Sequence, residues 1–214
     1  MFAHKERQRI VDLCVDLSKR GYLAGTGGNV ALRIDDDRFA VTPSATDYLA
    51  MSAADVCVVR LSDLQRIEGE RTPSVETGLH ARVLRARPEV RCSIHTHQPV
   101  ASAWALMDET LGADTDGARR SLGKRVPVVG YMPSGTGLLT RLVGRALRPG
   151  VNAYLMRNHG VICCGTSVDA AVKAVEQLEQ LARRQLLARI SNRAALHPER
   201  AAALHRVLTT LEKT

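Results

Sequence analysis

Six short apolar segments with the residue types of β-strands constrain the fold of this 214-residue chain most. Between them, amphipathic helices are predicted over residues 4–20, which Gly21 ends, over residues 77–86, which Pro88 ends, and from residue 167 onward. Strands alternating with helices predict a mixed α/β fold, and the length suits one domain covering residues 1–214. The six segments are residues 39–42, 55–61, 90–95, 126–129, 153–156 and 161–164.

The net charge of +8 does not by itself indicate a nucleic-acid partner, because the arginines are scattered and aromatic residues make up only 3% of the chain. A mild attraction for small anionic substrates is the expected use of that charge. No stretch is long and apolar enough for a membrane helix or a leader peptide, so we expect a cytoplasmic protein without membrane contact. The five cysteines lack CxxC spacing and predict no disulfides. Residues 108–124 mix glycine with charge and predict a mobile loop.

Three histidines stand at the ends of predicted strands. His95 and His97 are two residues apart on one strand, so both imidazoles face the same side and can reach one ion. His159 follows the predicted strand 153–156, and Gly160 after it permits a tight turn. Three neutral imidazoles with one open position form the ligand set of a catalytic zinc site. Each histidine alone is more often structural, so this prediction depends on the three together.

Two further segments have both an ordinary and a functional interpretation. Glu76 heads the predicted helix 77–86, where it is either an acid/base beside the metal or a favourable charge at a helix N-terminus. The glycine-rich segment at residues 25–29 can present backbone N–H groups to an anion, or it is only a turn.

Five motifs, taken in order and with their spacing, resemble the class II aldolase/adducin family over roughly residues 5–190. Known members of this family include fuculose- and rhamnulose-phosphate aldolases and ribulose-phosphate 4-epimerase. The motifs are Gly25-Thr26-Gly27-Gly28-Asn29, Val41-Thr42-Pro43-Ser44, Pro73-Ser74-Val75-Glu76, His95-Thr96-His97 and Arg157-Asn158-His159-Gly160.

The resemblance implies a three-layer α/β/α fold around a central mixed, largely antiparallel sheet. It also implies a homotetramer whose active sites lie between subunits. In similar enzymes the residues matching His95, His97 and His159 bind a divalent metal. The residue matching Glu76 completes the empty site as a further ligand and shuttles protons once substrate binds. The phosphate-binding positions of the family match Gly28, Asn29, Thr42, Ser44 and Ser74.

The sequence departs from the family pattern at several places. Ala31, Ala45 and Val75 stand where serine, glycine and serine are common, which predicts an anion site that is weakened, shifted or adapted to a carboxylate. Residues 111–124 lack the tyrosine by which aldolases of this type protonate the leaving fragment. Asp114 and Asp116 in that segment are either solvated loop residues or counterparts of the aspartate that the epimerases use.

We therefore expect an aldehyde-lyase of the aldolase type that cleaves a small keto-sugar phosphate or a related hydroxy-carbonyl compound through a metal-bound enediolate. The expected cofactor is Zn2+, with Mn2+, Co2+ or Fe2+ as alternatives, and the expected partner is a small anionic, carbohydrate-like substrate. Two alternatives reuse the same intermediate: 4-epimerisation of a sugar phosphate and decarboxylation of a 3-keto acid. A third is a non-catalytic, adducin-like interaction module.

Overall fold

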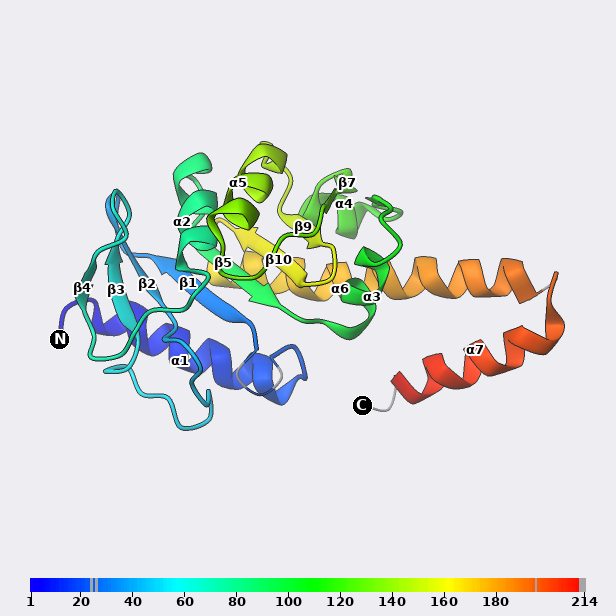
Figure 1. Ribbon diagram of the computed structural model, residues 1–214, viewed down its shortest axis with the longest axis horizontal. Coiled ribbons are helices and arrows are strands. Elements are labelled where there is room, and N and C mark those ends of the chain that lie inside the picture. The colour runs from blue at the N-terminus through cyan, green and yellow to red at the C-terminus, as the bar shows by residue number, and fades with distance from the viewer. Residues whose placement is uncertain (24, 26, 195, 212–214) are drawn as a thin grey trace.

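The computed structural model describes residues 1–23, 25, 27–194 and 196–211. Thr26 of the glycine-rich segment therefore lies outside the described residues. Within the described part, a large sheet is covered by helices on both faces (Figure 1).

The central sheet has eight strands, and neighbouring strands are antiparallel except for the parallel pair β8 and β9. A separate small ladder joins β6 (Leu111–Gly112) to β7 (Arg125–Val126). In spatial order the large sheet is β4 (Arg66–Glu68), β3 (Cys57–Arg60), β2 (Arg38–Val41), β1 (Asn29–Arg33), β5 (Cys92–Thr96), β10 (Gly160–Gly165), β9 (Ala153–Met156) and β8 (Val128–Val129).

The helices form two layers, one on each face of the sheet (Figure 1). One layer holds α2 (Thr77–Ala86) and α5 (Gly137–Ala146). The other holds α1 (His4–Lys19), α3 (Pro99–Ala105), α4 (Asp116–Leu122) and α6 (Val168–Ala194), and α7 (Pro198–Leu211) packs back along the far end of α6. The predicted three-layer α/β/α fold with a mixed, largely antiparallel sheet is confirmed.

Alternation along β5 divides its side chains between the two layers. Cys92 and Ile94 enter the core beneath α1, α3 and α6, whereas Ser93 and His95 face the layer of α2 and α5. Ser93 and His95 are fully buried on that second side, where polar groups require hydrogen-bond partners. Polar side chains therefore lie along this face of β5, toward the end of the strand.

Two parts of the fold differ from the sequence predictions. Residues 108–124 were expected to be a mobile loop, which is wrong: they contain β6 and the helix α4. The Thr115 hydroxyl caps α4 by accepting from the Ala118 N–H at 3.1 Å, and Leu122 anchors that helix in the core. The predicted strand 126–129 is two short strands, because Pro127 between them has no N–H to continue a ladder.

Other predictions hold in the described residues. The helix predicted over residues 77–86 and the strand predicted over residues 153–156 have those bounds in α2 and β9. All five cysteines are buried and unpaired, and they pack as small apolar residues. No helix among the described residues combines the length and apolarity that a bilayer span requires.

Candidate metal centre

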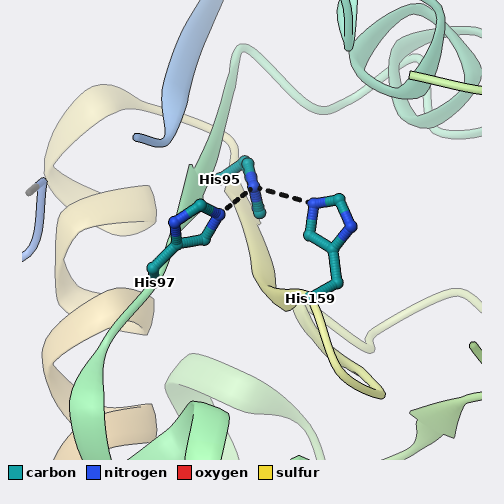
Figure 2. Close-up of side chains that lie close together, drawn as sticks. All are labelled: His95, His97 and His159. Atoms are coloured by element: carbon teal, nitrogen blue, oxygen red, sulfur yellow. Dashed lines mark hydrogen bonds between the residues drawn. The ribbon is translucent and has the colours of Figure 1, made fainter. Parts of the chain in front are cut away.

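The three histidines converge at one end of the sheet (Figure 2). His95 is in β5, His97 follows that strand, and His159 lies in the turn between β9 and β10. Nε2 of His95 is 3.0 Å from Nε2 of His97 and 3.2 Å from Nε2 of His159. The left-handed backbone of Asn158, with φ of 53°, closes the turn that brings His159 back to the strand end.

Hydrogen bonding fixes the tautomer of His95. Its Nδ1 lies 2.7 Å from the Val161 carbonyl, which only accepts, so Nδ1 carries the proton and Nε2 presents a lone pair. That lone pair faces the other two imidazoles and, at 3.1 Å, Oε2 of Glu76. The His95 nitrogen and the Glu76 oxygen both present lone pairs to one point, and a cation between them would stabilise both. Metal-binding histidines usually donate their other ring N–H to a carbonyl or carboxylate in this way, which fixes the orientation of the ring.

The spacing of the nitrogen atoms suits a small divalent ion. A tetrahedral site with metal–nitrogen bonds of about 2.0–2.1 Å separates its ligand nitrogens by about 3.3 Å, close to both distances from His95. Burial lowers the pKa of His95 to about 3, despite the attraction of the nearby Glu76 carboxylate, and burial also lowers the pKa of His97. Neutral imidazoles are the form that binds metal, so the cluster fits such an ion.

Gly160 is required by the closeness of this packing. A methyl group built on its Cα would lie 2.6 Å from Cδ2 of His97, 2.6 Å from the Thr96 carbonyl oxygen and 3.0 Å from Cε1 of His95. The glycine after the third histidine therefore serves the cluster by its small size, in addition to permitting the turn.

Glu76 stands beside the cluster at the N-cap of α2, with 4% of its surface exposed. Its Oε1 lies 2.8 Å from Nε2 of His159 and accepts from the Ser134 hydroxyl at 2.9 Å. Its Oε2 accepts from the side-chain amide of Asn29 at 2.8 Å. Burial raises the pKa of the Glu76 carboxyl, but the hydrogen bonds from His159 and Asn29 outweigh burial and hold that pKa well below its ordinary range.

A pocket of about 300 Å³ opens over His97, His159 and Glu76. Four of the five positions predicted for phosphate binding line it: Gly28, Asn29, Ser44 and Ser74. The remaining lining residues are Gly27, Pro43, Ala45, Tyr48, Val75, Ser134 and Asn158.

Thr42, the fifth predicted position, lies behind the pocket wall. Its side chain is fully buried, and its hydroxyl accepts from the Val30 N–H at 3.2 Å. Its carbonyl accepts from the Ser74 N–H at 3.0 Å and so aligns the two segments that form the wall. Thr42 therefore supports the pocket and offers its hydroxyl to β1 rather than to a ligand.

The three departures from the family pattern fall in different places. Ala45 and Val75 line the pocket, and the φ of 48° at Ala45 is a left-handed conformation that glycine adopts without strain. Val75 is 66% exposed and lies against Gly135. Ala31 is fully buried opposite Ser93 of β5, so the loss of a hydroxyl there does not alter the pocket lining.

The acidic residues at 114 and 116 are engaged elsewhere in this chain. Asp114 forms an ion pair with Arg184 at 2.7 Å, and Asp116 forms one with Arg119 at 3.1 Å within α4. Both carboxylates are exposed, and neither lines the pocket of its own chain. Tyr131 is 53% exposed and does not line that pocket either.

Sequence reasoning missed two residues that contact the centre. Ser134 reaches Glu76 from the loop before α5, and His80 contacts Asn29 from one turn into α2. His80 occurs four residues after Glu76, a helical spacing that could have indicated a shared face. Ser134 has no comparable pattern, since a serine in a turn is ordinary.

Comparison with known proteins agrees with this geometry. A family profile described as "Class II Aldolase and Adducin N-terminal domain" matches residues 8–186. Methylthioribulose-1-phosphate dehydratase of Serratia proteamaculans is 28% identical over 89% of this chain and 98% of its own length. L-fuculose phosphate aldolase of Methanococcus vannielii is 28% identical over 82% of this chain and 93% of its own.

A solved structure of L-fuculose 1-phosphate aldolase superimposes with a TM-score of 0.81 at 28% identity, covering 87% of this chain and 89% of the other. The profile match spans the whole of the large sheet and all three histidines. The chain therefore belongs to the class II aldolase and adducin family.

Proposed function

We propose that this protein is a divalent-metal-dependent lyase of the aldolase type that acts on a small keto-sugar phosphate or a related hydroxy-carbonyl compound. The convergence of three imidazole nitrogens and the Glu76 carboxylate beneath an open pocket is the observation that carries the proposal. Zinc is the proposed metal, since three histidines with an open position are its usual catalytic set, and Mn2+, Co2+ or Fe2+ would also accept them.

His95, His97 and His159 would hold the cation, which supplies positive charge next to the oxygens of a hydroxy-carbonyl group and so lowers the energy of an enediolate. Glu76 would exchange a proton with the carbon next to the carbonyl, because its carboxylate borders both the cluster and the pocket. With His159 on the cation, the bonds that hold Glu76 as an anion come from Asn29 and Ser134, and a substrate entering the pocket would compete for them.

The anion of the substrate would lie among Gly28, Asn29, Ser44 and Ser74, where short polar side chains line the pocket beside a glycine backbone. The Ser74 hydroxyl already accepts one hydrogen bond, from the Glu76 N–H at 3.2 Å. Val75 offers no hydroxyl, so we propose that this end accepts a phosphate with fewer direct bonds, or a carboxylate.

Dehydration of a ketose phosphate is the second candidate. It starts with removal of the same kind of proton and ends with loss of a neighbouring hydroxyl rather than cleavage of a carbon–carbon bond. Two observations favour it: the similarity to a dehydratase over most of both chains, and the lack of a tyrosine in residues 111–124. Epimerisation is less favoured, because Asp114 and Asp116 are paired with arginines of their own chain.

We further propose a homotetramer with active sites at subunit boundaries. Glu76 is the one carboxylate in the described lining of the pocket, and both candidate reactions need a second group that moves a proton. A neighbouring subunit would supply it. Light scattering of the purified chain tests this assembly directly.

Proton exchange tests the proposed chemistry without knowledge of the aldehyde partner. The metal-loaded protein is incubated with dihydroxyacetone phosphate in D₂O, and NMR follows the loss of the C–H signal next to the carbonyl. An aldolase exchanges one such proton. Glu76→Gln should retain the metal and lose exchange, whereas Glu70→Gln, at an exposed glutamate away from the pocket, should match wild type.

Full exchange in Glu76→Gln would remove that residue from the chemistry. A wild-type protein that binds metal but exchanges no proton would exclude the aldolase, and an assay with methylthioribulose 1-phosphate would then test dehydration.

A further inference from the structure

A buried row of polar groups leads from the metal centre into the interior beneath α2. The Asn29 side chain lies between Glu76 and His80: its Nδ2 is 2.8 Å from Oε2 of Glu76, and its Oδ1 is 2.6 Å from Nε2 of His80. The other ring nitrogen of His80, Nδ1, is 2.8 Å from the Ser93 hydroxyl. His80 and Ser93 are fully buried, and Asn29 is 6% exposed.

The direction of every bond in this row follows from the carboxylate at its end. An ionised carboxylate only accepts, so Asn29 must turn its NH₂ group to Glu76 and its carbonyl oxygen to His80. That oxygen also only accepts, so Nε2 of His80 carries the proton. Nδ1 of His80 is then the acceptor, and the Ser93 hydroxyl donates to it.

We propose that His80 is a positioning residue that holds the Asn29 amide with its NH₂ group toward the pocket, so that the pocket recognises an acceptor oxygen of the substrate at Asn29. This inference rests on the proposed function for its consequence in catalysis. The ligand chemistry it specifies is an anionic oxygen, of either a phosphate or a carboxylate.

The opposite orientation of the amide is disfavoured at the Glu76 end. Rotating Asn29 by half a turn would place its oxygen 2.8 Å from the Glu76 carboxylate, and its NH₂ group would require His80 to take the Nδ1–H tautomer and Ser93 to accept. A substrate hydroxyl seeking an acceptor would then bind, and an anionic oxygen would be repelled. Glu76 therefore sets which kind of ligand group Asn29 can meet, and the N–H of His80 holds the amide in that orientation.

The local fold explains how one histidine can do this. Glu76 and His80 are four residues apart, so the N-cap and the first turn of α2 present both side chains to the same side. Ser93 and Ala31 are direct partners across β5 and β1. Ser93 thus lies on the strand beneath α2, where its hydroxyl satisfies Nδ1 of His80.

The tautomer of His80 is the primary test and requires no catalytic activity. Long-range ¹H–¹⁵N spectra of the metal-free, full-length protein labelled at histidine distinguish the two neutral forms at neutral pH. The His80 signal is assigned by its absence in His80→Gln. An Nε2–H imidazole is expected, whereas an Nδ1–H imidazole or an imidazolium would overturn the proposal.

Anion binding tests the consequence for specificity. Titrations of the metal-free protein with inorganic phosphate and with glycolate separate the two sources of an anionic oxygen. His80→Phe, which keeps a ring but has no N–H, should weaken whichever anion binds by about tenfold, the effect of one charge-assisted hydrogen bond. His80→Gln, which keeps an N–H donor, should restore most of that loss. His205→Gln, at an exposed histidine, controls for the substitution itself.

Equal weakening in His80→Phe and His80→Gln would reduce His80 to a packing residue. Wild-type protein that binds neither anion would refute an anion-selective Asn29. Failure of the proposed function is distinguishable from both results: it is a protein with the Nε2–H tautomer and anion binding that exchanges no proton of dihydroxyacetone phosphate.

Discussion

Replacing Gly160 with alanine tests the geometry of the metal centre most directly. Gly160 does not have a left-handed φ, so alanine fits its backbone and the whole effect arises from the added methyl group. That carbon would lie 2.6 Å from Cδ2 of His97, whereas carbon atoms rest about 3.5–4.0 Å apart. The His97 ring must therefore retreat by about 1 Å, or β10 must move away from β5.

The expected cost has two parts. Overpacking of this kind destabilises a folded protein by about 1–3 kcal/mol. Metal sites tolerate ligand displacements of only about 0.2 Å, so zinc affinity should fall by about 100-fold or more. The structure thus predicts that the loss of metal binding exceeds what the loss of stability would produce.

Two measurements separate these parts. Competition with a chromophoric chelator gives the zinc affinity, and urea unfolding in EDTA gives the stability of the metal-free chain. Gly137→Ala is the matched control, because its added methyl group meets nothing within 4 Å and alanine is favoured over glycine in a helix. Wild-type zinc affinity in Gly160→Ala would refute the geometry described for His95, His97 and His159.

Three further predictions concern stability and reactivity. Burial lowers the pKa of His80 to about 4, below its ordinary 6.5, so on acidification the unfolded chain takes up this proton before the folded chain does. The metal-free protein should therefore lose up to about 3 kcal/mol of stability as the pH falls from 6.5 to 4, and the loss should be smaller in His80→Gln. Urea midpoints measured across that pH range test this. Glu179 accepts from the N–H groups of Val100 and Ala101 at 2.9 Å each, so Glu179→Ala should cost about 1–3 kcal/mol in urea unfolding, and an unchanged midpoint would show that α3 needs no such cap. Burial raises the pKa of all five cysteine thiols, so Ellman's reagent should label none of them in the native protein. Fast labelling without denaturant would contradict that burial.

Local patterns in the sequence were sufficient where one element carried its own signal. Residues 77–86 have a helical repeat that Pro88 ends, and α2 has those bounds. The spacing of His95 and His97 on a strand predicted a shared side, and His159 completes the cluster. The helix and the shared side of His95 and His97 follow from periodicity, whereas His159 was indicated by its place at the end of another predicted strand.

The parts that the sequence did not reveal depend on tertiary contacts. The strand β1, which begins at Asn29, was not predicted. Its side chains are buried on both faces of the sheet, so its sequence lacks the alternation of apolar and polar residues that marks a half-exposed strand. The threonine at position 42 looked like a ligand-binding residue, but its orientation was set by Val30 on the neighbouring strand. Ser134 reaches Glu76 only because the loop before α5 folds over α2, which no local pattern indicates.

The contact between His95 and Val161 links the metal centre to strand alignment. The two residues are 66 apart in the chain, and β10 carries both the Val161 carbonyl and, one residue before the strand begins, His159. A slip of β10 by one residue would turn that carbonyl away from His95 and displace His159 by about 3.3 Å. A bound ion would therefore favour the native register of β10 against β5 during folding, because only the chain in that register places all three histidines around the ion.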